Sequence, residues 1–206
     1  MKPAMLLIPV IGYLLGNLNG AVLLSKLVAH DDVRRHGSGN AGFTNFFRNY
    51  GGAVSLLVMV IDALKTIAAC LVGRLLGGEA ALHGVMLGAI GVTLGHDFPV
   101  FLGFKGGKGI VCGFTAALCL DWRIGLILFA VFVILYFSTK YVSLGSVVCA
   151  AIFLVGFWIL YWGDALLMAG SLLIGGLAIF MHRENIVRLV HGSERKTEFF
   201  KGKDTQ

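Results

Sequence analysis

Long apolar runs follow one another along most of this chain, and only short polar connectors separate them. Most of these runs approach the ~20 residues that a helix needs to cross the hydrocarbon core of a bilayer. Hydrophobic residues make up 57% of the 206 residues and charged residues 14%, which excludes an ordinary soluble domain. We therefore predict one all-α polytopic membrane domain over residues 1–206, with seven transmembrane helices at 4–29, 52–76, 81–99, 110–120, 123–139, 142–162 and 165–181.

The basic residues indicate which ends of these helices face the cytoplasm. Cytoplasmic connectors carry the excess of lysine and arginine in membrane proteins. One set of connectors holds only Lys2, Arg74 and Arg123, so this side is predicted to be outside, together with the N-terminus. The C-terminus is then cytoplasmic. The opposite set of connectors carries Arg34, Arg35, Arg48, Lys105, Lys108, Lys140, Arg183, Arg188, Arg195, Lys196, Lys201 and Lys203.

The formal net charge of +6 raises the question of which anionic partner the chain meets. The basic residues occupy short connectors and a tail, without a sustained basic helix or interleaved aromatic residues, so no nucleic acid partner is expected. Anionic lipid headgroups and phosphorylated substrates suit such connectors better. Three connectors rich in polar residues and glycine, at 36–48, 95–109 and 182–196, fall on the predicted cytoplasmic face, where they can form one site.

The connector at 95–109 combines positive charge with backbone freedom. Two ammonium groups stand among three glycines, so the backbone can turn its N–H groups toward a phosphate or an oxyanion. The alternative is a turn whose lysines only follow membrane topology. His96, at the end of the preceding apolar run, is expected either to orient a substrate or to cap the helix end. The loop residues predicted to bind substrate are Lys105, Gly106, Gly107, Lys108 and Gly109.

The connector at 36–48 contains Gly37, Gly39 and Gly42 in the spacing of a dinucleotide-binding loop. An apolar membrane run precedes these glycines where that motif requires a strand, so the dinucleotide interpretation fails. A glycine-rich backbone beside hydroxyl and amide side chains, followed by an arginine with its planar fork, can instead grip phosphate. The alternative is a well-hydrated loop. The side chains predicted to bind are Ser38, Asn40, Thr44, Asn45 and Arg48.

The connector at 182–196 continues the last apolar run into the cytoplasm. His182 and Asn185 are three residues apart, which places them on one side of a helix. His182 is the best candidate to touch a substrate hydroxyl, although a histidine at a helix end often serves only as a cap. Ser143 and Ser146, on the same predicted face, can join the site or can bond back to their own helix backbone.

Some features of the sequence favour structure over chemistry. Asp62 and Lys65 are three residues apart inside the second run, on one helical face. Ionisable residues at that depth mark function or a pair, and we favour a mutually compensating structural pair. Glycine lets membrane helices approach closely. We assign this packing role to Gly73, Gly88, Gly91, Gly125, Gly175 and Gly176.

The three polar connectors together resemble the motifs of the integral-membrane glycerol-3-phosphate acyltransferases that use acyl phosphate, the PlsY type of bacterial phospholipid synthesis. The resemblance covers nearly the whole chain. After the last glycine of the central motif the family often shows alanine and threonine, where this chain has Ile110 and Val111. The matching motifs are Gly-Ser-Gly-Asn-Ala-Gly-x-Thr-Asn-x-x-Arg at 37–48, Gly-His-x-x-Pro-x-Phe-x-x-Phe-Lys-Gly-Gly-Lys-Gly at 95–109, and His-x-x-Asn-Ile-x-Arg-Leu-x-x-Gly-x-Glu-x-Lys at 182–196.

This resemblance implies transfer of a fatty acyl group from acyl phosphate to the 1-hydroxyl of glycerol 3-phosphate. The products are lysophosphatidate and phosphate, in the first acylation of phospholipid synthesis. The resemblance also implies a multi-pass protein of the bacterial inner (plasma) membrane, with its active site on the cytoplasmic face. No cofactor and no metal are expected, and we expect a monomer.

The resemblance also assigns roles to individual residues. Arg48, Lys108 and Asn185 hold glycerol 3-phosphate, assisted by Ser143 or Ser146. His182 acts as general base or orienter, unless the phosphate of the acceptor takes the proton. Glu194 is structural. Ser38 counts with His182 and Asn185 among the catalytic candidates, as a hydrogen-bond donor and not a nucleophile, because no Ser-His-Asp arrangement is evident. The acyl phosphate lies against Ser38, Gly39, Asn40, Ala41, Gly42, Gly106, Gly107 and Gly109.

A small membrane transporter of an anion or phosphate ester is the alternative function. Such a protein also has basic loops and helices broken by glycine. It is expected to place charged groups near mid-membrane on several spans and to show internal symmetry. Only Asp62 and Lys65 meet the first expectation, and the sequence has no symmetry that supports the second.

Overall fold

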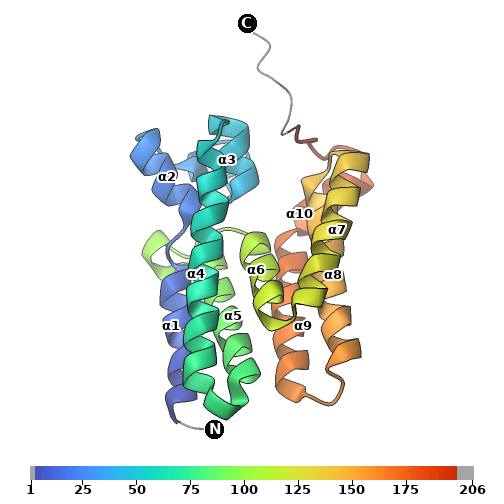
Figure 1. Cartoon of the computed structure of the whole chain (residues 1–206). Helices are drawn as coiled ribbons and strands as arrows, with labels where there is room; N and C mark the ends of the chain where they lie inside the picture. Colours follow the sequence, from blue (N-terminus) through green and yellow to red (C-terminus); the bar gives the residue numbers. More distant parts are fainter. Residues whose placement is uncertain (1–2, 199–206) are drawn as a thin grey trace, which may run out of the picture.

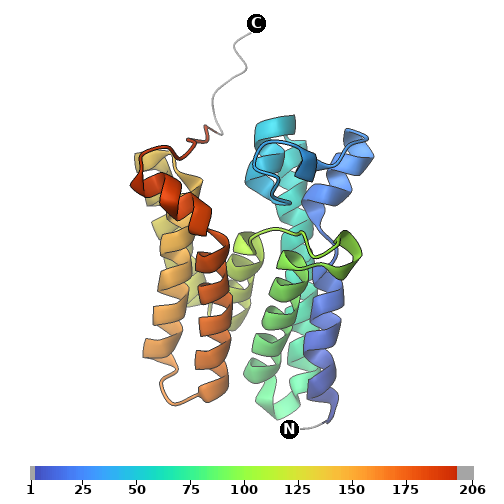
Figure 2. The same cartoon turned by 180° about the vertical axis from the view of Figure 1, so that it is seen from behind.

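The computed structural model describes residues 3–198, which form a bundle of helices (Figures 1 and 2). Residues 3–198 contain no β-strand, which confirms the all-α class. Lys2, Lys201 and Lys203, which entered the topology prediction, lie outside the described residues. The α-helices are α1 (Leu7–Gly16), α2 (Gly20–Val28), α3 (Phe43–Tyr50), α4 (Val54–Gly77), α5 (Ala81–Asp97), α6 (Ile110–Leu120), α7 (Trp122–Thr139), α8 (Val142–Leu160), α9 (Ala165–Met181) and α10 (Arg183–Val190).

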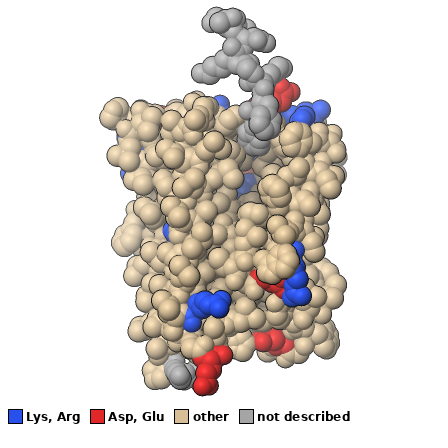
Figure 3. Space-filling model, in the orientation of Figure 1, with Lys and Arg blue, Asp and Glu red and all other residues tan. Residues whose placement is uncertain are grey.

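The helices follow the apolar runs closely. Helices α6 and α9 begin and end where the corresponding runs do, and α4, α5, α7 and α8 differ from theirs by at most two residues at either end. Figure 3 shows that uncharged residues cover most of one face of the molecule, as the surface of a membrane protein requires.

Several helical stretches are long and apolar enough to cross a membrane. Four stretches meet this criterion by themselves, and α9 with α10, which are bent by 54°, would make a fifth if they form one span. The second stretch contains α4 and α5, which lie side by side and run in opposite directions (Figure 1). Helix α6, with 11 residues, is only about 16 Å long, roughly half of the hydrocarbon thickness. Seven crossings and the orientation of the termini therefore stay predictions. The four stretches are Pro3–Val28, Val54–Leu102, Trp122–Thr139 and Val142–Leu160.

The first apolar run differs from the prediction. The sequence predicts one continuous helix at 4–29, whereas the structure interrupts it at residues 17–19, between α1 and α2. The Asn19 side chain caps α2 by accepting a hydrogen bond from its first turn. Lys65 Nζ donates to the carbonyl oxygen of Leu18 at 2.7 Å. The interrupted backbone thus finds its partners inside the protein, which is the condition for irregular backbone at membrane depth.

Asp62 and Lys65, inside α4, form the predicted pair. Lys65 Nζ lies 2.7 Å from Asp62 Oδ1, and both side chains are almost completely buried. The pair confirms the mutually compensating arrangement expected at this depth. At the other end of the bundle, His83 Nε2 lies 2.7 Å from Asp164 Oδ2 and links α5 to the start of α9.

Helices α1 to α5 and α7 to α10 form two lobes, with α6 between them (Figures 1 and 2). We call them the amino-terminal lobe and the carboxy-terminal lobe. One apolar core, which includes Met86, Ala117 and Phe157, packs α6 against both lobes. A second core, which includes Val33 and Phe46, lies where α2 and α3 meet α4. The lobes are therefore joined along the bundle, and α3 and α10 stand on either side of the end away from the N-terminus (Figure 1).

Glycine packing is confirmed at all but one of the predicted positions. A Cβ added at Gly73, Gly88 or Gly91 would lie 2.1–2.4 Å from a backbone oxygen of the neighbouring helix. Gly125 and Gly175 are similarly close to neighbouring atoms, at 2.3 and 2.8 Å. Gly176 has open space where its Cβ would stand, so the packing role predicted for it is wrong.

Candidate active site

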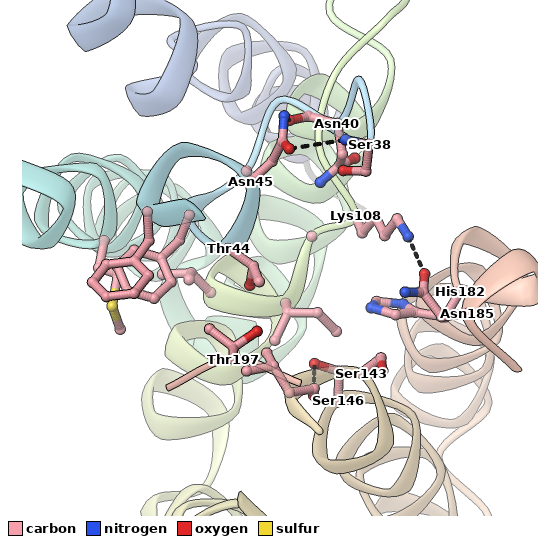
Figure 4. A pocket seen from close by; sticks show the side chains of 18 of the residues that line it. Ser38, Asn40, Thr44, Asn45, Lys108, Ser143, Ser146, His182, Asn185 and Thr197 are labelled. Carbon is pink, nitrogen blue, oxygen red and sulfur yellow. Dashed lines mark hydrogen bonds between the residues drawn. The ribbon is translucent and has the colours of Figure 1, made fainter. Parts of the chain in front are cut away.

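A cavity of about 1590 Å³ lies between the lobes, and all three polar connectors contribute to its wall. Apolar side chains of α6, α7, α8 and α9 form much of the remaining wall, among them Phe114, Phe129, Phe132 and Phe153. Figure 4 shows the polar side chains that face one another across it. The predicted site residues in the lining are Ser38, Gly39, Asn40, Gly42, Thr44, Asn45, Arg48, His96, Gly106, Lys108, Gly109, Ser143, Ser146, His182, Asn185 and Glu194.

The first glycine loop, which precedes α3, is shaped by Asn45. The amide of this buried residue lies within 3.0–3.1 Å of the carbonyl oxygens of Val33, His36 and Asn40. Its Oδ1 accepts a hydrogen bond from the backbone N–H of Ser38 at 3.0 Å. Asn45 is thus engaged by the loop itself, and the loop presents the exposed Ser38 hydroxyl at the cavity (Figure 4).

The second glycine loop, which follows α5, is folded back onto the end of that helix. The N–H groups of Gly106 and Gly107 donate to the carbonyl oxygens of Asp97 and His96, at 3.2 and 3.1 Å. The carbonyl oxygen of Gly106 accepts a hydrogen bond from the N–H of Ala41 at 3.3 Å, which joins the two glycine loops. Two loops separated by about sixty residues of sequence thus form one surface of the cavity.

Helix α6 starts at the cavity, directly after Gly109, which has a φ of +65°. The N–H groups in the first turn of a helix have no acceptor within the helix, and they attract negative charge. The carboxylate of Asp97 is buried without a hydrogen-bond partner among residues 3–198, and a Cβ on Gly109 would lie 3.1 Å from its Oδ1. Asp97 thus lies beside the start of α6, where the positive end of the helix favours a negative charge.

Glu194 holds together the polar side chains of the carboxy-terminal lobe. Its Oε1 accepts hydrogen bonds from Ser143 at 2.9 Å and from Asn185 at 2.8 Å, and its Oε2 pairs with Arg188 at 2.8 Å. Burial disfavours the charged form, but these three donors outweigh it and hold the pKa of Glu194 below its usual value. This arrangement fits the structural role that the sequence suggested.

The Lys108 side chain extends across the cavity from the second glycine loop to α10. Its ammonium group donates to Asn185 Oδ1 (Figure 4). Burial lowers the pKa of Lys108, and the nearby guanidinium of Arg188 lowers it further. Lys108, Asn185 and Glu194 therefore form a connected chain of hydrogen bonds from one lobe to the other.

His182 occupies the bend between α9 and α10 and is 5% exposed. Its Nδ1 lies 2.8 Å from the carbonyl oxygen of Ala178, which can only accept, so Nδ1 carries a hydrogen. In the neutral ring Nε2 is then free to accept a proton. The ring lies beside Asn185 and faces Lys108 in Figure 4.

Arg48 reaches from α3 to the segment after α10. Its guanidinium contacts Thr197 Oγ1 at 2.6 Å and the carbonyl oxygen of Arg195 at 2.8 Å. The carbonyl oxygen of Thr197 in turn accepts a hydrogen bond from Tyr136 on α7. Burial lowers the pKa of Arg48, but an arginine side chain is always protonated in proteins. Arg48 therefore brings a positive charge to the cavity.

Three predicted site residues are outside the cavity lining. Ala41 is buried, and its N–H is used by Gly106. Gly107 is buried above His96. Lys105 is exposed on the outside of its loop, where its carbonyl oxygen meets Arg34. Within the lining, Ser146 bonds back to the carbonyl oxygen of Val142, as its alternative interpretation expected.

The sequence prediction missed two residues of the site. Arg188 lines the cavity and holds Glu194, and its position three residues after Asn185 was a usable signal. Thr197 is 2% exposed and holds Arg48, but no pattern in the sequence marks it.

The fold and the cavity define a class of protein. A helical membrane protein that sets cationic side chains and glycine loops against an apolar wall can hold a molecule with a phosphate and a hydrocarbon chain. The class is thus an integral-membrane protein that handles phosphorylated, lipid-like molecules.

Known proteins narrow this class to a family. The family model described as glycerol-3-phosphate acyltransferase matches residues 6–192. The glycerol-3-phosphate acyltransferase of Thermoanaerobacter pseudethanolicus (strain ATCC 33223 / 39E) is 40% identical over 187 residues, which cover 91% of this chain and 92% of that protein. Glycerol-3-phosphate acyltransferase 2 of Thermotoga maritima is 37% identical over 196 residues, covering 95% and 97%.

Two solved structures are similar over almost the whole chain. They are crystal structures of PlsY (YgiH), an integral membrane glycerol 3-phosphate acyltransferase, at 30% sequence identity. The glycerol 3-phosphate form has a TM-score of 0.85 and covers 94% of this chain and 96% of that one. The lysophosphatidic acid form has a TM-score of 0.81 and covers 95% and 96%. This chain belongs to the glycerol-3-phosphate acyltransferase family, in its integral-membrane PlsY type.

Proposed function

We propose that this protein transfers a fatty acyl group from an acyl phosphate to the 1-hydroxyl of glycerol 3-phosphate. The products are lysophosphatidate and inorganic phosphate. One observation carries the proposal: the three polar connectors, far apart in sequence, line a single cavity whose other wall is apolar. Two phosphorylated molecules can lie against the polar groups while the acyl chain lies against the apolar side chains.

Glycerol 3-phosphate is proposed to bind between Arg48, Lys108 and Asn185. Arg48 and Lys108 supply positive charge, and the guanidinium can hold a phosphate through paired hydrogen bonds. Ser143 and Asn185 have their orientation fixed by Glu194. The present partners of Arg48, Thr197 and the carbonyl oxygen of Arg195, are neutral, so a phosphate can replace them at a gain in electrostatic energy.

The acyl phosphate is proposed to bind at the two glycine loops and the start of α6. Ser38 and Asn40 contribute side-chain donors, and Gly39, Gly42, Gly106 and Gly109 let the substrate approach the backbone. Lys105, Gly107 and Ala41 act on this site only indirectly, through the shape and charge of the loops. The phenylalanine-rich wall of α6 and α7 accommodates the hydrocarbon chain.

The proposed reaction breaks one bond and forms one. The 1-hydroxyl oxygen attacks the acyl carbonyl carbon, and the bond from that carbon to the phosphate oxygen breaks. His182 Nε2 takes the hydroxyl proton, or a phosphate oxygen of the substrates takes it; a positioned general base contributes about 10²–10⁴ in rate. Because acyl phosphate is an activated mixed anhydride, holding the two substrates together supplies much of the remaining acceleration, on the order of 7–11 kcal/mol in favourable cases.

The decisive experiment uses the purified full chain in detergent with acyl phosphate and labelled glycerol 3-phosphate. We expect lysophosphatidate and phosphate in equal amounts, and no product when an acyl thioester replaces acyl phosphate. Product formed with the acyl thioester but not with acyl phosphate would refute acyl phosphate as the donor. Uptake of labelled glycerol 3-phosphate into protein-containing vesicles, without any product, would refute acyl transfer in favour of transport.

We also propose that the cavity opens toward the cytoplasm of a bacterial cell, in its inner membrane. The distribution of lysine and arginine between the two sets of connectors supports this orientation. Cysteines introduced at exposed positions near opposite ends, Ser138→Cys and Trp162→Cys, test it in intact cells, in a protein whose four native cysteines have been replaced by alanine. A membrane-impermeant thiol reagent is expected to label the second variant only, and labelling of the first variant alone would reverse the orientation.

A further inference from the structure

A buried charged cluster lies directly beneath the second glycine loop, and the reaction described above makes no use of it. The cluster consists of Asp62 and Lys65 on α4 and His96 at the end of α5. Lys65 Nζ is 2.7 Å from Asp62 Oδ1 and 2.8 Å from His96 Nδ1. No side chain of the three is more than 5% exposed. Burying so many ionisable groups is costly unless their contacts serve structure or function.

Some contacts of this cluster stabilise the fold. Lys65 also donates to the carbonyl oxygens of Gly16 and Leu18, at 3.2 and 2.7 Å, and Asp62 accepts from the N–H of Gly20 at 3.4 Å. These contacts hold the ends of α1 and α2 at their interruption. They do not account for the contact with His96, because the two carbonyl oxygens and the Asp62 carboxylate already match the three hydrogens of the ammonium.

The contact with Lys65 fixes the hydrogen positions on His96. An ammonium group has three hydrogens and no lone pair, so it donates and Nδ1 of the ring accepts. The ring hydrogen of a neutral His96 is then on Nε2. If instead the ring were protonated and paired with Asp62, which lies 3.5 Å from Nδ1, both ring nitrogens would carry hydrogen. In either state Nε2 is a hydrogen-bond donor.

That donor faces the glycine loop. A Cβ added to Gly107 would lie 2.1 Å from His96 Nε2, and a Cβ added to Gly106 would lie 2.0 Å from the carbonyl oxygen of His96. Only glycine allows the loop to lie this close to the ring. His96 belongs to the cavity lining, together with Gly106 and Gly109. Among residues 3–198, no hydrogen-bond partner of His96 Nε2 exists.

We propose that Lys65 is a positioning residue that holds His96 with its Nε2–H toward the second glycine loop, where it donates to the anionic group bound there. Asp62 keeps the ammonium charged at this depth. The identity of that group as the phosphate of an acyl phosphate rests on the proposed function. The proposal that His96 offers a hydrogen-bond donor to a phosphate oxygen does not depend on the proposed function.

The proposal gives the two histidines of the cavity opposite tasks. His182 donates through Nδ1 to Ala178, which leaves Nε2 as an acceptor for a hydroxyl proton. His96 accepts at Nδ1 from Lys65, which leaves Nε2 as a donor to phosphate. The carbonyl oxygen of Ala178 thus sets one ring to take a proton, and the ammonium of Lys65 sets the other to give a hydrogen bond.

The tautomer is the direct test, and it needs no activity. Protein labelled with ¹⁵N at histidine and placed in lipid nanodiscs is studied by NMR, and the His96→Gln variant identifies the His96 signals. We expect hydrogen on Nε2 and a shift of that signal when inorganic phosphate is added. A ring with hydrogen on Nδ1 alone, or an Nε2 signal that phosphate leaves unchanged, would overturn the proposal even if acyl transfer is demonstrated.

Kinetics separate positioning from structural support. His96→Leu is expected to raise the KM for acyl phosphate about 10-fold or more while the KM for glycerol 3-phosphate stays within about twofold, since a hydrogen bond to a charged group is lost. His96→Gln, whose amide can donate from a similar position, is expected to recover most of this loss. His83→Gln, at the other end of α5, is the matched control and should change neither KM.

A double-mutant cycle tests whether Lys65 acts through His96. Lys65→Met is combined with Asp62→Asn, so that no unpaired charge is left buried. Thermal unfolding checks that the double variant is folded. We expect this pair of changes to raise the KM for acyl phosphate in the wild-type background and to add little in the His96→Leu background. Fully additive effects would mean that the cluster only supports the helix interruption, and would overturn the positioning role.

Discussion

In the amino-terminal lobe the helices meet backbone against backbone, whereas in the carboxy-terminal lobe they meet largely through side chains. A Cβ at Gly84 of α5 would lie 2.0 Å from the carbonyl oxygen of Gly73 on α4. A Cβ at Gly95 would lie 2.1 Å from that of Tyr13 on α1. In the carboxy-terminal lobe, a Cβ at Gly145 of α8 would instead meet a side chain, the ring of Phe132 on α7, at 2.8 Å.

This difference extends to what each lobe contributes to the cavity. The amino-terminal lobe presents two loops whose backbone geometry is fixed by Asn45 and by the end of α5. The carboxy-terminal lobe presents side chains that are oriented by one another, with Glu194 at their centre. We expect close backbone contact to give the rigid surface that the proposed phosphate site needs, and side-chain packing to leave room for the proposed acyl chain.

The largest effect is expected from Gly84→Ala, which attacks the backbone contact itself. The new methyl group would lie 2.0 Å from a backbone oxygen, which cannot move aside as a flexible side chain could. We expect a destabilisation of about 3 kcal/mol or more, measured by thermal unfolding in detergent. Gly176→Ala in α9 is the control, because open space receives its methyl group. Equal losses in the two variants would contradict the contrast between the lobes.

His182→Ala tests a side chain of the carboxy-terminal lobe. Removal of the proposed base is expected to lower kcat about 100-fold or more and to leave the melting temperature nearly unchanged. Steady-state assays at saturating concentrations of both substrates measure this effect. His191→Ala, at an exposed position beyond α10, is the control. A kcat within twofold of the wild-type value would exclude His182 as the base and leave proton transfer to the substrate phosphate.

Arg48→Ala tests the side chain with which the amino-terminal lobe reaches across the cavity. Loss of a charge-assisted, paired contact with phosphate is expected to raise the KM for glycerol 3-phosphate about 10- to 100-fold. Titration of glycerol 3-phosphate at a fixed concentration of acyl phosphate measures the effect. Arg35→Ala removes an exposed arginine outside the cavity lining and should change little. If the two variants behave alike, Arg48 does not bind this substrate.

The smallest effect is expected from the pH dependence of the Glu194 contacts. The pKa of Glu194 in the folded protein is held below the usual 4.5, so its charged contacts stabilise the fold fully above that pH. This contribution is lost as the pH falls through the lower, folded-state pKa. Melting temperatures measured between pH 6 and pH 3 should therefore fall more for the wild type than for Glu194→Gln. Parallel curves would mean that Glu194 contributes no charge-dependent stability; Glu184→Gln, on the exposed side of α10, is the control.

The sequence predicted most helix ends because they depend on local properties. The apolar runs end at glycines, prolines and polar residues, and α6 and α9 agree with their predicted bounds at both ends. The interruption at residues 17–19 escaped prediction because Gly16, Asn17 and Asn19 sit in a sequence that is still largely apolar. What stabilises it is Lys65, almost fifty residues away.

The sequence predicted which residues belong to the candidate site better than it predicted the contacts among them. Motif glycines and charged residues revealed which connectors meet, but not how each residue is used. Asn45 was expected to bind substrate, and the sequence did not reveal that its amide also holds the first glycine loop. Thr197 went unmarked because a single threonine near a chain end has no local signature of contact with an arginine on α3.

By itself, the sequence determined that this chain is helical, that it is a membrane protein of one family, and that three polar connectors can meet at one place. Those properties follow from residue type and spacing, which act over one or two turns of helix. The tertiary structure decided which groups face the cavity and which partners the ring nitrogens of His96 and His182 meet. These depend on partners such as Lys65 and Ala178, and a hydrogen bond forms only where folding brings donor and acceptor within about 3 Å.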